Sequence, residues 1–99
     1  MISVGIIGAS GYTGAELLRI CSKHPNFEVK TAVASTYAGT AISDVHVHLS
    51  PEFPEMLFED KDSAPLSECE IIFTGLPHGA SQKVIPELLE TAKLIVDLG

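Results

Sequence analysis

Tryptophan is absent from this sequence, and aromatic and basic side chains are scarce. Aromatic residues make up 6% of the chain, and 6 Lys and Arg stand against 13 Asp and Glu, which gives a formal charge of −7. A surface that binds nucleic acid or an anionic membrane needs a basic face that neutralises phosphates. The composition therefore argues against both kinds of partner, and an anionic ligand has to be held by local donors such as backbone N–H groups.

Long apolar runs and paired cysteine motifs are missing as well. No apolar stretch approaches the roughly 20 residues of a membrane-spanning helix. Cys21 and Cys69 form no C-x-x-C motif, and residues 1–7 carry no basic segment of the kind that begins a signal peptide. Free thiols without a secretory leader are typical of a reducing compartment, so we expect a cytoplasmic protein.

Hydrophobic residues reach 45% of the chain and recur in alternating strand-like and helix-like segments. Small aliphatic side chains suit a sheet that is covered by helices on both faces. The β-α-β-β-α-β order predicts an α/β fold, a Rossmann-type, doubly wound and mostly parallel sheet of about five strands. We expect strands at 2–7, 27–34, 56–59, 71–76 and 93–98, helices at 15–23 and 80–91, and helical turns near 41–45 and 65–68.

The first predicted helix has an apolar face and a charged face. On the charged side, Glu16 and Arg19 have the spacing of a surface ion pair. Cys21 lies on the packing side and Cys69 directly precedes a predicted strand, so both thiols are interpreted as inert core groups. The predicted apolar face consists of Leu17, Leu18, Ile20 and Cys21.

The glycines between the first strand and the first helix have the spacing G-x-x-G-x-x-G. Gly8 permits a tight turn off the strand, Gly11 lets the backbone approach a pyrophosphate, and Gly14 lets the helix pack closely on the strand. The start of the helix directs N–H groups and a positive dipole end at the anion. The alternative is a tight turn without a ligand. The candidate phosphate-binding residues are Gly8, Ser10, Gly11, Tyr12, Thr13 and Gly14, with hydroxyl donors from Ser10 and Thr13.

The end of the second predicted strand bears on the choice of cofactor. NAD-binding proteins place a carboxylate about 20 residues past the glycine loop, where it holds the ribose 2′-OH. Here Ser35 and Thr36 occupy these positions, and no acid lies between Glu28 and Asp44. The missing carboxylate and the two hydroxyls favour NADP, although no Arg is present to clamp its 2′-phosphate. The alternative is a polar turn without a ligand.

A second loop, residues 75–79, follows the fourth predicted strand. Ligands of open α/β sheets sit at the carboxyl ends of the strands, so this loop is expected to edge the cofactor site. Leu76, Pro77 and His78 are therefore added to the candidate cofactor contacts. The alternative is that His78 is a loop residue without chemistry.

Three other groups are interpreted as structural. His46 and His48 have the His-x-His spacing of a metal-binding pair, but no third ligand is evident, so they are expected to be solvent-exposed loop residues and no metal site is predicted. Asp97 is expected to cap or hydrogen-bond a following loop. A solvated acidic edge is expected from Glu52, Glu55, Glu59, Asp60 and Asp62.

The motifs together closely resemble N-acetyl-γ-glutamyl-phosphate reductase, over all 99 residues and in the amino-terminal, cofactor-binding part of that enzyme. The strings Gly-Ala-Ser-Gly-Tyr-Thr-Gly at 8–14 and Leu-Pro-His-Gly at 76–79 are the most specific. Related aspartate-semialdehyde dehydrogenases usually do not share the Tyr-Thr or the Pro-His-Gly. One departure concerns Thr36, which stands where many members of the family carry Arg and which weakens the grip on a 2′-phosphate.

The resemblance implies the NADPH-dependent reduction of an acyl phosphate, N-acetyl-glutamyl 5-phosphate, to its semialdehyde in arginine biosynthesis, by a homo-oligomeric enzyme. It also implies a cysteine nucleophile and a histidine acid/base that lie beyond residue 99, so no catalytic residue is expected within this chain. Residues 1–99 are thus expected to be a dinucleotide-binding domain, a fragment of a longer two-domain enzyme and inactive alone. The alternatives are a non-catalytic NADP-binding module, and another semialdehyde dehydrogenase or a short-chain-type reductase.

Overall fold

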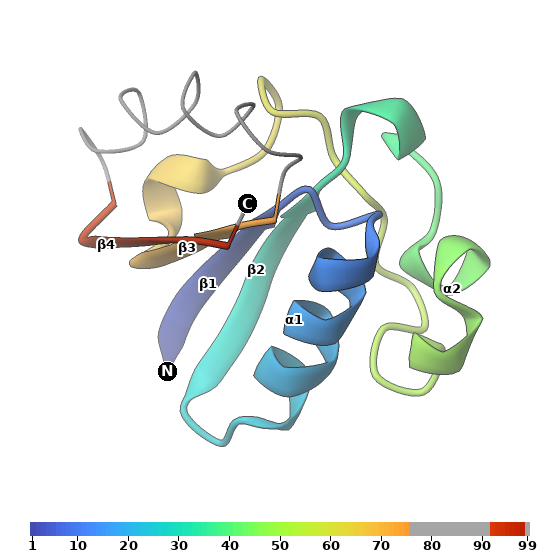
Figure 1. Ribbon diagram of the computed structural model, residues 1–99, viewed down its shortest axis with the longest axis horizontal. Helices are drawn as coiled ribbons and strands as arrows, with labels where there is room; N and C mark the ends of the chain where they lie inside the picture. The colour runs from blue at the N-terminus through green and yellow to red at the C-terminus, as the bar shows by residue number, and fades with distance from the viewer. Residues whose placement is uncertain (76–91, 99) are drawn as a thin grey trace.

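The computed structural model describes residues 1–75 and 92–98, whose strands form one parallel sheet (Figure 1). The strands are β1 (Ile2–Ile7), β2 (Phe27–Val33), β3 (Ile71–Thr74) and β4 (Leu94–Asp97). They lie side by side in the order β2-β1-β3-β4. The chain thus leaves β1 on one side to form β2 and returns on its other side to form β3. This reversal confirms the predicted Rossmann-type sheet and creates a switch point, where ligands of open α/β sheets bind.

Helix α1 (Tyr12–Lys23) connects β1 to β2 and covers one face of the sheet (Figure 1). It begins at Tyr12 rather than at residue 15, and it ends before Pro25, because the residue that precedes a proline disfavours the helical conformation. The predicted ion pair is confirmed, with Arg19 Nε 2.7 Å from Glu16 Oε2.

The buried face of α1 is narrower than predicted. It consists of Gly14, Leu17, Leu18 and Cys21, whereas Ile20 is 52% exposed, so the prediction for Ile20 is wrong. Successive residues of an α-helix lie about 100° apart. Gly14, Leu17, Leu18 and Cys21 define the buried face of the helix, and Ile20 falls on its flank.

The sheet buries apolar side chains on both faces. Val4 and Ile6 of β1 join the cluster under α1, and both are fully buried. Ile7 belongs to a second cluster on the opposite face, which also contains Leu66 and Ile72. Because side chains alternate along a strand, β1 supplies both cores at once, as a central strand of an α/β sheet does.

No helix within residues 1–75 and 92–98 is long and apolar enough to cross a membrane.

The chain between β2 and β3 forms short helical turns in place of regular elements. These turns are η1 (Ser35–Tyr37), α2 (Ile42–Val45), η2 (Val47–Leu49) and η3 (Leu66–Glu68). The turns predicted near 41–45 and 65–68 are confirmed as α2 and η3. Figure 1 shows α2 beside α1, and the apolar residues of this region extend the cluster under α1: Ile42, Leu49, Phe53 and Phe58.

The strand predicted at 56–59 is wrong. Among the described residues this segment makes isolated bridges, Val33 with Glu59 and Ala41 with Leu57. Its Glu59 N–H donates to Ala32 O at the edge of β2, but its Phe58 N–H donates to the loop, at Thr40 O. Because the segment divides its hydrogen bonds between two partners, no ladder is propagated. The helix predicted at 80–91 lies outside the described residues.

The first turn of α1 lies against the end of β1 with no room for a side chain at Gly14. A Cβ on Gly14 would lie 2.4 Å from Gly8 O and 2.6 Å from Ala9 Cα, both of them backbone atoms. A Cβ on Gly11 would meet nothing nearer than Gly8 O, at 3.7 Å. The role predicted for Gly14, close packing of helix on strand, is thus confirmed.

We expect Gly14→Ala to destabilise the fold and Gly11→Ser to leave it almost unchanged. The overpacking at Gly14 costs about 1–3 kcal/mol or more, which exceeds the gain of about 1 kcal/mol from replacing a helical glycine by alanine. Serine at residue 11 has space, and it is a favoured residue at the N-cap position that directly precedes a helix. Thermal unfolding checks this, with Gly14→Ala lower in Tm by at least about 4 °C and Gly11→Ser within about 2 °C of the parent. Equal melting temperatures for the two variants would contradict the packing argument.

Candidate functional site

The conformation and the hydrogen bonds of its backbone fix the turn between β1 and α1 at the carboxyl end of the sheet. Gly8 has a φ of 79°, which confirms the predicted tight turn that favours glycine. The N–H groups of Gly8 and Ala9 both donate to Val33 O at 3.0 Å, so the turn is fixed to the end of β2. Gly11 precedes α1, and no side chain caps the helix there. The N–H groups of the first helical turn therefore have no carbonyl partner one turn earlier within the helix.

A cleft of about 650 Å³ lies over the carboxyl ends of β1, β2 and β3. It brings together the glycine loop and the end of β2, as the sequence predicts, with Gly75 on its far side. Gly14 does not line the cleft but supports it from behind. Leu76, Pro77 and His78, the other predicted contacts, lie outside the described residues. The predicted residues that line the cleft are Gly8, Ser10, Gly11, Tyr12, Thr13, Ser35 and Thr36.

Lys61 also lines this cleft, and the sequence analysis missed it. It supplies a positive charge to the cleft that Ser35 and Thr36 also line, and no Arg lines that cleft among the described residues. Its position in an irregular segment after the bridge at Glu59 explains the omission, because no periodic pattern connects it to β2. The only sequence signal is its isolation as a cation among the acidic residues at 59–62.

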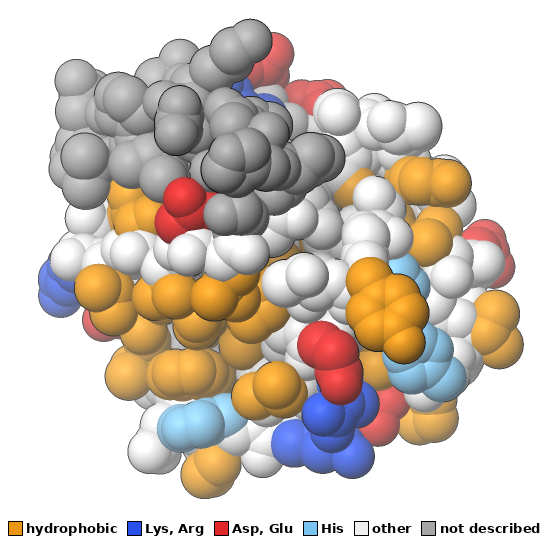
Figure 2. All heavy atoms as spheres, viewed as in Figure 1, with side chains coloured by type: hydrophobic (Ala, Val, Ile, Leu, Met, Phe, Trp, Pro, Cys, Tyr) orange, Lys and Arg blue, Asp and Glu red, His pale blue; other side chains and the backbone are white. Residues whose placement is uncertain are grey.

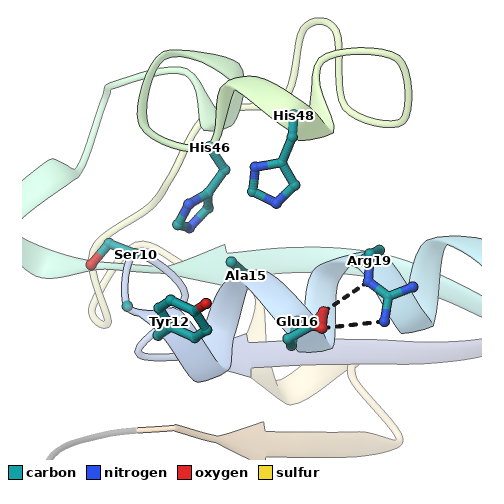
Figure 3. A pocket seen from close by; sticks show the side chains of 8 residues that line it. Ser10, Tyr12, Ala15, Glu16, Arg19, His46 and His48 are labelled. Atoms are coloured by element: carbon teal, nitrogen blue, oxygen red, sulfur yellow. Dashed lines mark hydrogen bonds and ion pairs between the residues drawn. The ribbon is translucent and has the colours of Figure 1, made fainter.

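A second cavity, of about 490 Å³, lies on the other side of the glycine loop (Figure 3). Helix α1 forms its floor through Tyr12 and the Glu16–Arg19 pair, and the segment around η2 forms its roof through His46 and His48. The two cavities share the residues at the start of the helix: Ser10, Gly11 and Tyr12.

His46 corrects the prediction of two exposed histidines. His48 is exposed, but His46 is only 8% exposed, and its Nε2 lies 2.8 Å from Ala9 O in the glycine loop. The edge of its ring meets Phe58, with ring centroids 6.0 Å apart. The short turn η2 brings this histidine inward because its neighbours Ile42 and Leu49 are buried in the same core.

The acidic residues at 52–62 and Asp97 form separate contacts. Glu59 and Asp60 are half-buried rather than part of a fully solvated edge, and Glu59 Oε1 accepts a hydrogen bond from the buried Thr31 hydroxyl at 2.8 Å. Asp97 Oδ1 accepts one from Thr74 Oγ1 at 2.9 Å, which ties β4 to β3 at the end of the sheet. Within residues 1–75 and 92–98, no three His, Cys, Asp or Glu side chains gather in a way that could hold a metal ion.

Figure 2 shows that the Lys and Arg side chains on one face of the molecule are few and separated. On that face the described residues thus form no continuous basic surface of the kind that nucleic-acid binding requires.

Comparison with known proteins places this geometry among dehydrogenases. Residues 3–99 match the family model described as semialdehyde dehydrogenase, NAD binding domain. N-acetyl-gamma-glutamyl-phosphate reductase of Methanopyrus kandleri is 41% identical over 100 residues, and that of Methanocella arvoryzae is 42% identical over 99 residues. Each alignment covers 99% of this chain and 29% of the relative, so the chain spans less than a third of the length of these relatives.

A solved structure has a similar fold. The crystal structure of aspartate semialdehyde dehydrogenase with NADP from Candida albicans superimposes with a TM-score of 0.81 at 23% sequence identity. The superposition covers 98% of this chain and 29% of the other. The likeness confirms the fold of this chain.

The two thiols of the chain lie in the core and are not poised for nucleophilic attack, as predicted. Cys21 is 1% exposed and Cys69 is 2% exposed. Burial raises the pKa of Cys21 above its ordinary value. Burial, assisted by the nearby Glu68 carboxylate, raises the pKa of Cys69 to about 11. Since the thiolate is the reactive form, both groups are unreactive near neutral pH.

We expect alkaline pH to destabilise the protein partly through Cys69. Above the ordinary thiol pKa of about 8.5, the unfolded chain loses this proton while the folded chain keeps it up to about pH 11. The free energy of unfolding therefore falls as pH rises, by about 2 kcal/mol from this group between pH 8 and pH 10. Urea denaturation of the parent and of Cys69→Ala at both pH values measures it. The variant should lose less stability than the parent, and an identical loss would refute the assignment.

Proposed function

This chain belongs to the family of semialdehyde dehydrogenase NAD-binding domains, and we propose that it is the cofactor-binding part of an NADPH-dependent N-acetyl-γ-glutamyl-phosphate reductase. The observation that carries the proposal is the cleft at the switch point of the sheet, in which the glycine loop, Ser35, Thr36 and Lys61 meet. The similarity to reductases of that name over almost the whole chain supports the substrate class.

The proposed reaction reduces an acyl phosphate to an aldehyde and releases phosphate. A cysteine thiolate displaces the phosphate to give a thioester, and NADPH supplies the hydride that releases the aldehyde. Buried Cys21 and Cys69 do not fit the nucleophile, so we place the catalytic cysteine outside these residues. The part left to this chain is to bind and orient the cofactor.

The glycine loop suits the pyrophosphate of a dinucleotide. The uncapped amides at the start of α1 and the positive end of the helix dipole favour an anion over Gly11. Ser10 and Thr13, which carry hydroxyl groups, line the same cleft. With no Cβ at Gly11, the backbone can approach the phosphates closely.

The end of β2 suits the 2′-phosphate of NADP. Ser35 and Thr36 offer hydroxyl donors, no carboxylate lines the cleft within residues 1–75 and 92–98, and Lys61 adds a cation. A 2′-phosphate gains charge-assisted hydrogen bonds from such a set, whereas the 2′-OH of NAD lacks a carboxylate partner. The fold neighbour whose structure is described as solved with NADP supports the same choice.

The burial of both thiols also favours a second candidate, a nucleotide-binding module without chemistry of its own. A third candidate, another semialdehyde dehydrogenase, shares the cofactor site and differs in substrate. Reduction of N-acetyl-glutamyl 5-phosphate by the full-length protein, without reduction of aspartyl phosphate, would favour the first candidate. The second candidate would reduce neither compound, and the third would reduce a different acyl phosphate. We further propose that the protein is cytoplasmic, as its two free thiols suggest, and that the full enzyme is a homo-oligomer.

Gly11→Val is expected to abolish NADPH binding while the fold persists. The backbone at Gly11 is extended, with φ −82° and ψ −178°, a conformation that valine adopts readily. Its side chain would occupy the place of the pyrophosphate, so affinity should fall at least a hundredfold, or about 3 kcal/mol. Calorimetric titration with NADPH measures the affinity, and thermal unfolding is the control for the fold. Equal affinity in variant and parent would remove the glycine loop from the phosphate site.

Cofactor preference is expected to follow the charge at the end of β2. Ser35→Asp sets a carboxylate against the 2′-phosphate and should weaken NADP about ten- to a hundredfold, while NAD binds as well or better. Thr36→Arg should strengthen NADP through a bidentate contact. Lys61→Met should weaken NADP about tenfold and leave NAD unchanged.

Matched controls are available for both changes of charge. Ser67→Asp adds the same charge on exposed η3, and Lys93→Met removes the same charge at an 80% exposed side chain. Neither residue lines the cleft, so neither change should alter the ratio of NADP to NAD affinity. A parent that prefers NAD, or a Ser35→Asp variant with unchanged preference, would leave only a generic dinucleotide site.

A further inference from the structure

One hydrogen bond links the glycine loop to a distant part of the chain. His46 Nε2 lies 2.8 Å from Ala9 O, across 37 residues of sequence. Ala9 is fully buried, and His46 is nearly so. Figure 3 shows His46 directed down toward the turn that carries Ser10 at the start of α1.

The partner determines which nitrogen of His46 carries a proton. A backbone carbonyl only accepts hydrogen bonds, so Nε2 of His46 donates. On another side the imidazole packs against the buried ring of Phe58, with ring centroids 6.0 Å apart. The donor is therefore aimed at Ala9 O by a packed core rather than by a mobile surface side chain.

The carbonyl of Ala9 belongs to the same peptide unit as the N–H of Ser10. In a trans peptide these two groups point in opposite directions, and none of the described peptide bonds is cis. Holding Ala9 O toward His46 thus fixes Ser10 N–H to point away from His46. To turn this peptide unit over, ψ of Ala9 and φ of Ser10 would both have to change, and Ala9 O would lose its hydrogen bond to His46.

We propose that His46 is a positioning residue for cofactor binding, which fixes the Ala9–Ser10 peptide so that Ser10 N–H is presented to the pyrophosphate. This inference rests on the proposed function of the glycine loop and adds a contact from the opposite side of that loop. Ser10 lines both cavities, so its peptide unit stands between His46 and the cleft. The proposed phosphate-binding site therefore includes a residue, His46, that does not line the cleft.

The experiment compares two nucleotides that differ in the pyrophosphate. The compound 2′-phospho-ADP-ribose carries it, whereas 2′-AMP has only the adenine, ribose and 2′-phosphate that the end of β2 would hold. His46→Phe keeps an aromatic ring in the core but removes the donor, and His46→Gln restores an N–H donor. His48→Phe makes the same change at an exposed neighbour in the same cavity.

We expect His46→Phe to weaken 2′-phospho-ADP-ribose about tenfold, the effect of one lost buried hydrogen bond, and 2′-AMP less than twofold. The His46→Gln and His48→Phe variants should stay within about threefold of the parent for both nucleotides. Unchanged binding in His46→Phe, or equal weakening of both nucleotides, would overturn the inference. A parent that binds neither nucleotide would overturn the proposed function and the inference with it.

A second measurement needs no variant. In the parent protein, NMR of the His46 side chain should show a proton on Nε2 that is protected from exchange. Its resonance should shift when 2′-phospho-ADP-ribose is added and stay in place with 2′-AMP. If 2′-phospho-ADP-ribose binds but neither nucleotide shifts this resonance, the result would count against the role of His46.

Discussion

The close approach of α1 to the end of β1 is the constraint on which the rest of the structure depends. It is possible because Gly14 has no side chain where Gly8 O and the Ala9 backbone already stand. This contact sets the start of the helix directly over the end of the central strand. Tyr12 and Thr13 of the first helical turn then line the cleft, and the Ala9 carbonyl on the other side of the loop comes within reach of His46. The same contact at Gly14 therefore both packs the core and shapes the site.

The irregular chain between β2 and β3 completes what the βαβ unit begins. Its apolar residues Ile42 and Phe58 close the cluster under α1, and this burial fixes where the segment runs. The segment returns to the edge of β2 at Glu59, whose N–H and C=O bond to Ala32 O and Ala34 N. That return places Lys61 at the cleft beside the end of β2. A stretch without regular structure therefore supplies both a cation in front of the glycine loop and a histidine behind it.

Much of the fold and half of the site follow from local patterns in the sequence. The four observed strands, α1, the turn at Gly8 and the close packing at Gly14 are predictable because periodicity and turn chemistry act over a few residues. The prediction for Ile20 is wrong because the buried face of α1 is narrow, so an apolar residue at its flank stays exposed. The strand at 56–59 failed because its hydrogen bonds are divided between β2 and a loop. Lys61 and buried His46 depend on tertiary contacts of irregular chain, for which no local pattern exists.

The start of α1 shows how a chain of charge −7 can present a site for an anion. Acidic residues and side-chain caps usually stabilise the first turn of a helix, yet the first turn of α1 has neither. The nearest acid on the helix, Glu16, is paired with Arg19, and this guanidinium lowers the pKa of Glu16. The pair leaves little net charge next to the loop, and screening confines more distant acids to a range of about 8–10 Å. A capping or acidic side chain at the start of α1 would stand where the cofactor's phosphates are proposed to bind. Gly11 departs from the usual preference for such a side chain and so leaves that place open.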